Sequence, residues 1–293
     1  MQRPWLAHYP AGVPAEIGHD YPRTLAQLIE EALERYAERT AVTFLGGHIT
    51  YRQLDHASRA ASAWLVQQGL SPGSRVALMM PNVPQYLACL LATLRAGHVV
   101  VNVNPLYTAR ELAAQLADSG AEVIFILESF AHTLEAALPH CSVRRVVLVT
   151  MGDMLGPVRG TVFNGIIRHV RKMVPAYRLP GAVKFSDIAR TAGSGTPNTS
   201  LNLTQTTPVP DNLAFLQYTG GTTRMPKAAM LTHGNLAANV EQVRAWFEPR
   251  LQTASGPQRV ILSALPLYHV FSLTCSLCAL RTGMCNVLVP NAR

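Results

Sequence analysis

The chain is 293 residues long, with 48% hydrophobic and 14% charged residues, and this balance excludes an intrinsically disordered protein. The length is enough for a substantial core in one or two domains. The formal net charge of +8 favours an anionic partner such as a nucleotide or an anionic lipid surface. No nucleic-acid partner is expected, because the basic residues do not form a stripe with interleaved aromatic rings.

The first part of the chain contains three capping boxes, in which a threonine precedes a glutamine or glutamate by three residues. The threonine side chain accepts a hydrogen bond from the backbone of the third residue, whose side chain binds the threonine backbone N–H in return. Each box therefore predicts the start of a helix: Thr24-x-x-Gln27, Thr50-x-x-Gln53 and Thr108-x-x-Glu111.

Short apolar runs alternate with these and other helical segments, and they predict strands at Ala41–Leu45, Val76–Met80, Val99–Val103, Glu122–Leu127 and Arg145–Val149. Gly46-Gly47 is predicted as a hairpin turn after the first of these strands. Strands that are separated by whole helices need crossover connections, which indicate parallel pairing and burial on both faces. The predicted fold class is α/β, with largely parallel sheets covered by helices.

The segment near 159–180 is basic and has no acidic residue between Asp153 and Asp187. Its apolar residues repeat at helical spacing, and they are Phe163, Ile166, Ile167, Val170, Met173 and Val174. Its cations, with the neighbouring lysine, are Arg159, Arg168, Arg171, Lys172, Arg178 and Lys184. Two interpretations remain open: a basic amphipathic helix on an anionic membrane surface, or a helix packed on the domain with solvated charges.

The segment 192–210 is rich in Thr, Ser, Gly, Pro and Asn and predicts a linker. It divides an N-terminal α/β subdomain, 1–191, which carries the basic insert, from the start of a second α/β subdomain, 211–293. Val260–Leu280 contains no formally charged residue, but Pro266 and His269 interrupt it. It is therefore interpreted as buried core rather than as a membrane span.

A glycine- and threonine-rich loop with one lysine, from Thr219 to Lys227, follows the apolar run Leu213–Tyr218. Glycines let the backbone approach a ligand, successive N–H groups and hydroxyls bind one anion, and the lysine adds a positive charge. The sequence therefore predicts a phosphate-binding loop. It is neither a Walker A loop, because Ala228 follows Lys227, nor the Gly-x-Gly-x-x-Gly loop that binds dinucleotides.

This loop resembles the phosphate loop of the adenylate-forming (AMP-binding) enzymes, which usually reads Tyr-Thr-Ser/Gly-Gly-Thr-Thr-Gly-x-Pro-Lys-Gly. It departs from that pattern at Arg224 and Ala228, which replace glycines and are expected to impair the loop. The segments that resemble bacterial long-chain fatty-acid CoA ligases in particular are Pro81-Asn82, Leu94–Gly97 and Asn102–Leu112. Leu265–Phe271 resembles the family's next core motif, and the resemblance runs from about Thr24 to Arg293.

The resemblance implies that ATP, Mg²⁺ and a fatty acid bind, that an acyl-adenylate forms, and that coenzyme A then displaces AMP. It implies that His269 positions the substrate carboxylate, that Thr219 lies near magnesium and that Lys227 takes part in catalysis. It further implies a set of contacts to the ATP phosphates, made by Thr219, Gly220, Gly221, Thr222, Thr223 and Lys227.

Several functional groups of the family follow the part that this sequence resembles: an acidic magnesium ligand, a ribose-binding aspartate, a hinge and the lysine of a small C-terminal domain. The resemblance thus predicts the N-terminal part of a long-chain fatty-acid CoA ligase, truncated before the C-terminal domain and with an incomplete second subdomain. Independent turnover is doubtful on this basis, and a separate polypeptide is one candidate source of the missing half. An exposed sheet edge that promotes aggregation is a further expectation.

Two alternatives stay open. One is an inactive remnant or a membrane-associated module that binds nucleotide or lipid, and the other is a different acyl- or aryl-CoA ligase. The five scattered cysteines do not suggest a disulfide framework, and Met1 to Gly18 lacks the apolar core of a signal peptide. The expected location is the cytoplasm, with peripheral attachment to the inner face of the cell membrane under the first interpretation of the basic insert.

Overall fold

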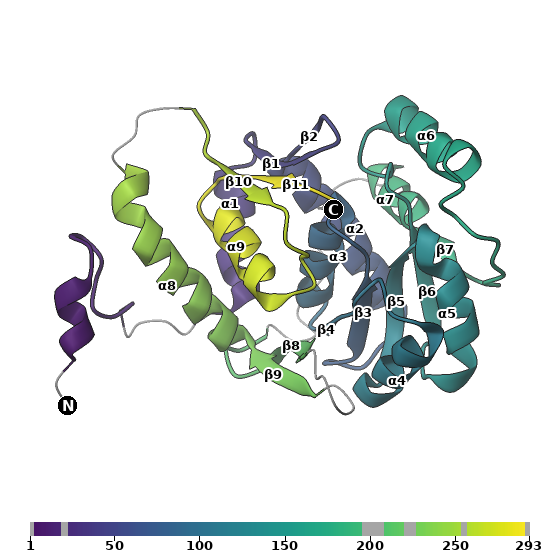
Figure 1. The fold of residues 1–293 in the computed structure, drawn as a ribbon, viewed down its shortest axis with the longest axis horizontal. Helices are drawn as coiled ribbons and strands as arrows, with labels where there is room; N and C mark the ends of the chain where they lie inside the picture. The colour runs from purple at the N-terminus through teal and green to yellow at the C-terminus, as the bar shows by residue number, and fades with distance from the viewer. Residues whose placement is uncertain (1–2, 19–22, 195–207, 220–226, 253–256, 291–293) are drawn as a thin grey trace.

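Two mostly parallel sheets flanked by helices form the fold (Figure 1). The structure is a computed structural model, and it describes residues 3–18, 23–194, 208–219, 227–252 and 257–290. The larger sheet has the strand order β7 (Val183–Lys184), β6 (Arg145–Val149), β5 (Ala121–Leu127), β3 (Arg75–Met79), β4 (Val99–Asn102), β8 (Leu213–Tyr218), β9 (Ala228–Thr232). The smaller sheet has the order β10 (Val260–Ser263), β11 (Cys285–Leu288), β1 (Thr40–Phe44), β2 (Gly47–Thr50).

The α-helices pack around and between these sheets (Figure 1). They are α1 (Leu25–Arg35), α2 (Tyr51–Gln67), α3 (Pro84–Arg95), α4 (Ala109–Ser119), α5 (Ala131–Ala137), α6 (Pro157–Gly165), α7 (Phe185–Ser194), α8 (His233–Gln252) and α9 (Val270–Arg281). All pairings in the larger sheet are parallel except β8 with β9, and in the smaller sheet only β1 with β2 is antiparallel. The predicted α/β class with largely parallel sheets is confirmed.

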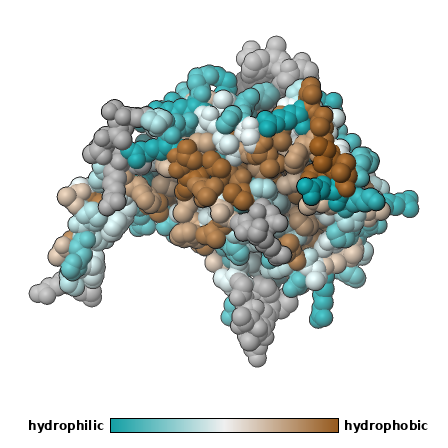
Figure 2. All heavy atoms as spheres, turned by 45° about the horizontal axis from the view of Figure 1, so that its top comes forward, coloured by the Kyte–Doolittle hydropathy of each residue, from teal (hydrophilic) through white to brown (hydrophobic). Residues whose placement is uncertain are grey.

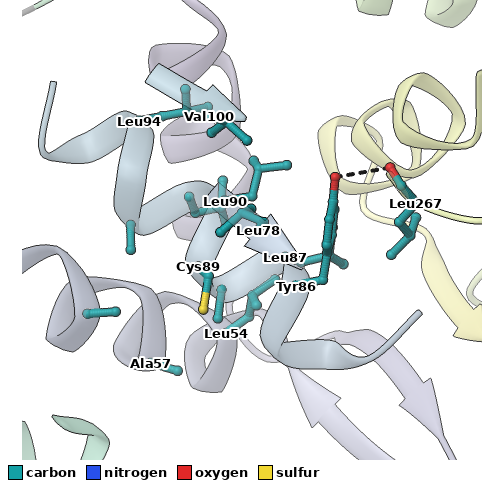
Figure 3. Close-up of a cluster of buried hydrophobic side chains, with 14 of the residues drawn as sticks. Leu54, Ala57, Leu78, Tyr86, Leu87, Cys89, Leu90, Leu94, Val100 and Leu267 are labelled. Atoms are coloured by element: carbon teal, nitrogen blue, oxygen red, sulfur yellow. Dashed lines mark hydrogen bonds between the residues drawn. The ribbon is translucent and has the colours of Figure 1, made fainter. Parts of the chain in front are cut away.

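Alternate residues of the central strands belong to two different apolar clusters, so the larger sheet is buried on both faces. In β3, Val76 and Leu78 join the cluster that contains α2 and α3, whereas Ala77 and Met79 join the cluster that contains α4 and α5. Figure 3 shows the first cluster, where Leu90 of α3 lies beside Leu78 and Leu54 of α2 lies beside Cys89. This double burial is what continuous apolar strands predict.

The three capping boxes form as predicted. The hydroxyl oxygens of Thr24, Thr50 and Thr108 accept backbone hydrogen bonds at 3.2, 3.1 and 3.4 Å, and the glutamine or glutamate returns a contact in each case. The hairpin turn lies one residue earlier than predicted, because Leu45 and Gly46 hold the positive φ angles, +48° and +71°, and Gly47 already begins β2.

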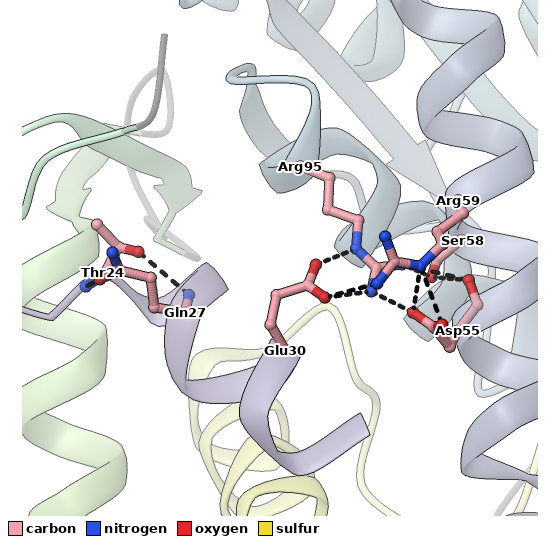
Figure 4. Close-up of polar contacts among 7 residues, drawn as sticks. All are labelled: Thr24, Gln27, Glu30, Asp55, Ser58, Arg59 and Arg95. Carbon is pink, nitrogen blue, oxygen red and sulfur yellow. Dashed lines mark hydrogen bonds and ion pairs between the residues drawn. The ribbon is translucent and has the colours of Figure 1, made fainter. Parts of the chain in front are cut away.

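An arginine on α3 joins the helices α1, α2 and α3 (Figure 4). The Arg95 side chain is only 5% exposed, and its Nη2 atom lies 2.9 Å from Glu30 of α1. It also pairs with Asp55 of α2, whose carboxylate binds Arg59 at 3.0 Å. Because the buried charge has two carboxylate partners, removal of either partner would leave it undercompensated.

Both sheets combine strands from either side of 192–210, so they do not follow the predicted division at that segment. β8 pairs with β4, with Phe215 opposite Val100, and β11 pairs with β1, with Asn286 opposite Val42. Helix α7 extends to Ser194, and 195–207 lies outside the described residues.

The uncharged stretch Val260–Leu280 divides into β10, a short connection and most of α9. None of the described helices has the length and hydropathy that a bilayer crossing requires.

Candidate active site

The predicted phosphate loop lies between two antiparallel strands, β8 and β9. Its described ends meet, because Thr219 N donates to Lys227 O at 3.0 Å and Thr219 Oγ1 lies 3.3 Å from the same oxygen. The next pair, Tyr218 and Ala228, is already in strand register. The predicted phosphate contacts Gly220, Gly221, Thr222 and Thr223 lie outside the described residues, as does the departure at Arg224.

The loop follows the carboxyl end of a strand that runs parallel to its neighbour. β8 pairs in parallel with β4, and β4 pairs in parallel with β3. In open α/β sheets, ligands bind outside the carboxyl ends of parallel strands. Thr219 and Lys227 are both exposed at this edge, so their side chains are accessible to a ligand.

A segment without regular structure, Leu265–His269, lies over the same edge and leads into α9. Asn82, which follows β3, makes two hydrogen bonds to this segment and one to the end of β10. Its Nδ2 atom donates to Ser263 O and Leu265 O, both at 2.9 Å, and its Oδ1 atom accepts from Leu267 N at 2.8 Å. Asn82 is 2% exposed, so these bonds replace water contacts that burial has removed.

A second set of side chains joins this segment to the strand before the phosphate loop. Gln217 of β8 donates from Nε2 to Tyr268 O at 3.0 Å, and its Oε1 atom accepts from Asn102 Nδ2 at 2.8 Å. The Tyr86 hydroxyl of α3 lies 3.0 Å from Leu267 O and 2.8 Å from Asn102 Oδ1. The structure therefore brings the ends of the phosphate loop and the residues around His269 to one edge of the larger sheet.

His269 itself is exposed and is the residue before α9. Its ring centroid lies 4.6 Å from that of Tyr268, with the planes tilted by 45°. Burial and the nearby Tyr107 raise the pKa of Tyr268, so this phenol stays protonated at neutral pH. An accessible imidazole beside a protonated phenol can donate a hydrogen bond to a carboxylate or phosphate oxygen.

Tyr218 fixes the end of β8 from the other side. Its hydroxyl donates to Asp118 Oδ2 of α4 at 2.6 Å. Burial and this carboxylate raise the pKa of Tyr218 far above its ordinary value, so it is a permanent donor. The residue before the loop is therefore anchored to α4 while Gln217, one residue earlier, is anchored to the His269 segment.

The described residues supply donors for an anion but no acidic metal cluster. No group of three or more His, Cys, Asp or Glu side chains in the described part of the chain is arranged to hold a metal ion. Thr219, the predicted magnesium contact, has an exposed side chain whose hydroxyl makes its hydrogen bond to Lys227 O. The chemistry that these residues can perform is binding and orientation of anionic groups.

The side chains that hold the site together have no role predicted from the sequence. These are Asn82, Tyr86, Asn102 and Gln217, all less than 9% exposed. Two of them carry a sequence signal, because Asn102 ends an all-valine run and Gln217 interrupts an apolar strand. A polar residue in a strand buried on both faces needs a partner, and here that partner is the next segment of the site.

Comparison with known protein families identifies the family of this chain. The AMP-binding enzyme family matches residues 29–293. The chain belongs to that family. The match includes the hairpin that carries the phosphate loop and the segment that carries His269, the two parts that meet at the edge of the larger sheet.

Among curated relatives of this AMP-binding chain, a long-chain-fatty-acid–CoA ligase of Salmonella typhimurium is 46% identical over 295 residues, covering 100% of this chain and 51% of the relative. The enzyme of the same name from Escherichia coli O6:H1 is 45% identical with the same coverage. The chain therefore spans about half the length of the curated relatives that it matches.

The fold of this AMP-binding chain also matches solved structures. The crystal structure of a long-chain-fatty-acid-CoA ligase from Archaeoglobus fulgidus has a TM-score of 0.69 and 22% sequence identity. The matched region covers 97% of this chain and 50% of the Archaeoglobus fulgidus chain. At this identity the likeness establishes the fold alone.

Proposed function

We propose that this chain forms the part of a long-chain fatty-acid CoA ligase that binds the ATP phosphates and orients the fatty acid. The single observation that carries the proposal is the Gln217–Tyr268 hydrogen bond, which joins the strand of the phosphate loop to the segment of His269. An enzyme that adds a carboxylate to the α-phosphate of ATP needs these two groups side by side. The names and identities of the curated relatives support the long-chain fatty acid as substrate.

In the proposed reaction the fatty-acid carboxylate attacks the α-phosphorus of ATP, pyrophosphate leaves, and an acyl-adenylate remains. The thiolate of coenzyme A then attacks the acyl carbon, and AMP leaves with the bonding electrons. Lys227 and the donors of the loop, Thr219, Gly220, Gly221, Thr222 and Thr223, would bind the β- and γ-phosphates. His269 would hold the carboxylate in line. Such steps depend chiefly on positioning and on neutralisation of charge.

Magnesium, when bound, would supply positive charge that neutralises the phosphates. The Thr219 hydroxyl is the described group that we propose to face it. No cluster of acidic side chains in the described ranges accompanies this hydroxyl. No step of the reaction is therefore assigned to the metal.

The test is ATP–pyrophosphate exchange with a panel of fatty acids, on the chain alone and mixed with the second half of the Salmonella typhimurium relative. We expect exchange that requires a long-chain acid and falls about 100-fold or more in Lys227→Ala, because a lost contact to a developing charge costs about 3 kcal/mol. Lys184→Ala is the matched control, since Lys184 is also an exposed lysine but belongs to β7, at the opposite edge of the larger sheet.

Each other outcome selects an alternative. Exchange with aromatic acids in place of fatty acids would make the chain part of an aryl-CoA ligase. Absence of exchange under both conditions would leave an inactive remnant or a binding module, which equilibrium dialysis with ATP would distinguish.

An exposed apolar face beside the site supports a protein partner (Figure 2). Val260, Leu262, Leu265 and Phe271 are between 55% and 67% exposed, and β10 is the outermost strand of the smaller sheet in the described part of the chain. The curated relatives are about twice as long as this chain. We propose that a polypeptide equivalent to their second half covers this face and completes the enzyme.

Co-purification of that second half with the wild-type chain, and its loss in Leu262→Glu, would support the partner. Val158→Glu is the control, because Val158 is 78% exposed but lies on α6. Equal binding by wild type and Leu262→Glu would contradict the assigned face.

A membrane surface is the second candidate partner, and the observation that favours it is the outer face of the basic insert. Val158, Val162, Ile166 and Val170 recur every fourth residue along α6 and the π-helical turn that follows it, and they are 78%, 59%, 41% and 71% exposed. Figure 2 shows a hydrophobic column between polar atoms where Figure 1 places α6. Such a stripe can enter the headgroup region of a bilayer.

The cations of the insert divide between two roles. Arg159 donates to Leu45 O and Gly46 O at 2.9 and 3.0 Å, and Arg168 pairs with Glu128, so both hold the insert on the domain. Arg171 and Lys172 are exposed near the apolar stripe and are available to anionic headgroups. Arg159 and Arg168 thus fit a helix packed on the domain, whereas Arg171 and Lys172 fit a helix on an anionic membrane surface.

Sedimentation with vesicles of phosphatidylglycerol and phosphatidylethanolamine tests this surface. We expect the chain to sediment with them and to lose most of that binding in Val162→Asp/Val170→Asp. Val209→Asp is the control, because Val209 is 53% exposed on another part of the surface. Sedimentation that the double substitution leaves unchanged, or no sedimentation of the wild type, would contradict the proposal.

A further inference from the structure

Gln217 is a buried amide in a strand whose neighbours are apolar, and it lies two residues before the phosphate loop begins. It is 8% exposed, between Leu216 and Tyr218 at the end of β8. Its side chain reaches beyond its own strand to another part of the site, where it donates a hydrogen bond to the backbone carbonyl of Tyr268. Burial of an amide is costly unless both of its ends are paired, so its contacts define its role.

The orientation of both amides in this network follows from one carbonyl group. Tyr268 O can only accept, so the nitrogen of the Gln217 amide must face it, and the oxygen must face Asn102. Asn102 then has to present its nitrogen to Gln217 and its oxygen to the Tyr86 hydroxyl. A flip of either amide alone would place two acceptors together. The two amides therefore have a single arrangement, while the one proton of the Tyr86 hydroxyl is shared between two acceptors, Asn102 Oδ1 and Leu267 O.

The far end of the network is fixed in the core. Tyr86 is fully buried on α3, and Figure 3 shows its hydroxyl pointing to the carbonyl oxygen of Leu267. Burial raises the pKa of Tyr86 far above its ordinary value, so the hydroxyl keeps its proton. Gln115 of α4 adds a bond of 2.8 Å to Asn102 O. Helices on both faces of the sheet thus hold the same network in place.

We propose that Gln217 is a positioning residue, which fixes the His269 segment relative to the nucleotide bound after β8. The proposal rests on the function proposed above, since it concerns how that site aligns its two reactants. The distance from Gln217 to Thr219 along an extended strand is about 7 Å, and this short path is rigid because Tyr218 is bonded to Asp118. A displacement of Thr219 on nucleotide binding would therefore be transmitted to Tyr268 through the Gln217 side chain.

The test compares two buried glutamines that each donate to one main-chain carbonyl. Gln85 is fully buried on α3 and donates to Thr150 O at 3.0 Å, at the end of β6 rather than in the His269 segment. Gln217→Met and Gln85→Met remove these bonds with little change of volume. We measure amide hydrogen exchange over 264–270 in each variant and in the wild type, first without nucleotide.

We expect Gln217→Met to accelerate exchange in this segment by about fivefold to tenfold, as loss of one hydrogen bond predicts, and Gln85→Met to leave it unchanged. Equal effects of the two variants would mean a general loss of stability and would overturn the proposal. If Gln217→Met does not fold, Tyr86→Phe replaces it, because this variant deletes one oxygen atom that faces Leu267.

The second arm repeats the exchange with ATP and magnesium, after equilibrium dialysis has measured binding. We expect ATP to protect 264–270 in the wild type and in Gln85→Met, and to bind Gln217→Met without protecting that segment. A merely structural role would not separate binding from protection. If the wild type binds no ATP, the proposed function fails, while the comparison without nucleotide still decides whether Gln217 holds the segment. ATP protection that persists in Gln217→Met would overturn the coupling.

Discussion

The interior of the larger sheet and its carboxyl edge are held together by different means. In the interior, apolar side chains on both faces of β3, β4 and β5 pack against helices, and the strands satisfy one another's backbone groups. At the edge, the segment Leu265–His269 has no ladder partner, and side-chain amides and a phenol bind its backbone instead. Apolar burial therefore builds the platform, whereas a few polar groups decide where the reactive segment lies on it.

The largest expected effect is the loss of stability caused by a substitution in the interior of the larger sheet. Phe125 of β5 is fully buried and its ring lies 6.2 Å from that of Trp64. Phe125→Ala should lower the free energy of unfolding by about 3 to 5 kcal/mol, because it removes a large apolar contact and leaves a cavity. Chemical denaturation followed by tryptophan fluorescence measures the loss. A loss below about 1 kcal/mol would show that this interior can repack around a cavity.

Asn82→Ala tests the carboxyl edge of the larger sheet. It removes the Asn82 bonds to Ser263 O, Leu265 O and Leu267 N. Ser263 O still accepts from Val289 N, and Leu265 O still accepts from the Ser272 hydroxyl, so the group left unpaired is Leu267 N. The substitution should therefore cost about 2 kcal/mol in stability. Unlike Phe125→Ala, it should also accelerate exchange in 264–270 beyond the change in global stability. Asn235→Ala is the control, because Asn235 is an exposed asparagine that binds only the nearby backbone of Thr232. Equal acceleration throughout the protein would contradict a separate role for the edge.

A third prediction concerns the pH dependence of stability and a buried carboxylate at the end of another strand, β6. Asp153, after β6, accepts from Thr150 N at 2.8 Å, and burial raises its pKa to about 6. Because the folded protein holds this proton more tightly than the unfolded chain, stability should fall as pH rises from about 4 to about 6 and then level off. The contribution is at most about 3 kcal/mol, given about 1.4 kcal/mol per unit of pKa.

Asp153→Asn removes the titrating group. The difference in unfolding free energy between variant and wild type, measured from pH 4 to pH 7, isolates its contribution. We expect the unfolding free energy of Asp153→Asn to increase relative to that of the wild type as the pH increases. A difference that does not change with pH would show that Asp153 does not titrate in this range.

Features that depend on neighbouring residues could be predicted from the sequence, and features that depend on distant partners could not. The predicted capping boxes at Thr24, Thr50 and Thr108 are confirmed because each depends on only four consecutive residues at the start of a helix. The parallel pairing is correct because long connections between strands permit little else. By contrast, the pairing of β11 with β1 joins the two ends of the described fold, and no local pattern indicates it.

The candidate site divides in the same way. Thr219, Lys227 and His269 can be predicted as site residues from their motifs, which are continuous in sequence, and their roles stay predictions. Gln217 cannot be predicted in this way, because its contact depends on a carbonyl group of residue 268 that the fold brings within 3.0 Å. The basic insert shows the same limit, since its composition is visible in the sequence, while the inward direction of Arg159 and Arg168 depends on Leu45, Gly46 and Glu128.

The parallel pairing of β1 with β11 has a consequence for the order in which the chain folds. During synthesis, Val42 leaves the ribosome long before Asn286, the residue that it faces in the finished sheet. Until then β1 has only its hairpin partner β2, and one edge of that hairpin is open to other chains. Pairing between residues so far apart is slow, because a long loop must close first. The nascent protein is therefore a natural client for chaperones that shield unpaired strands until β11 has been made.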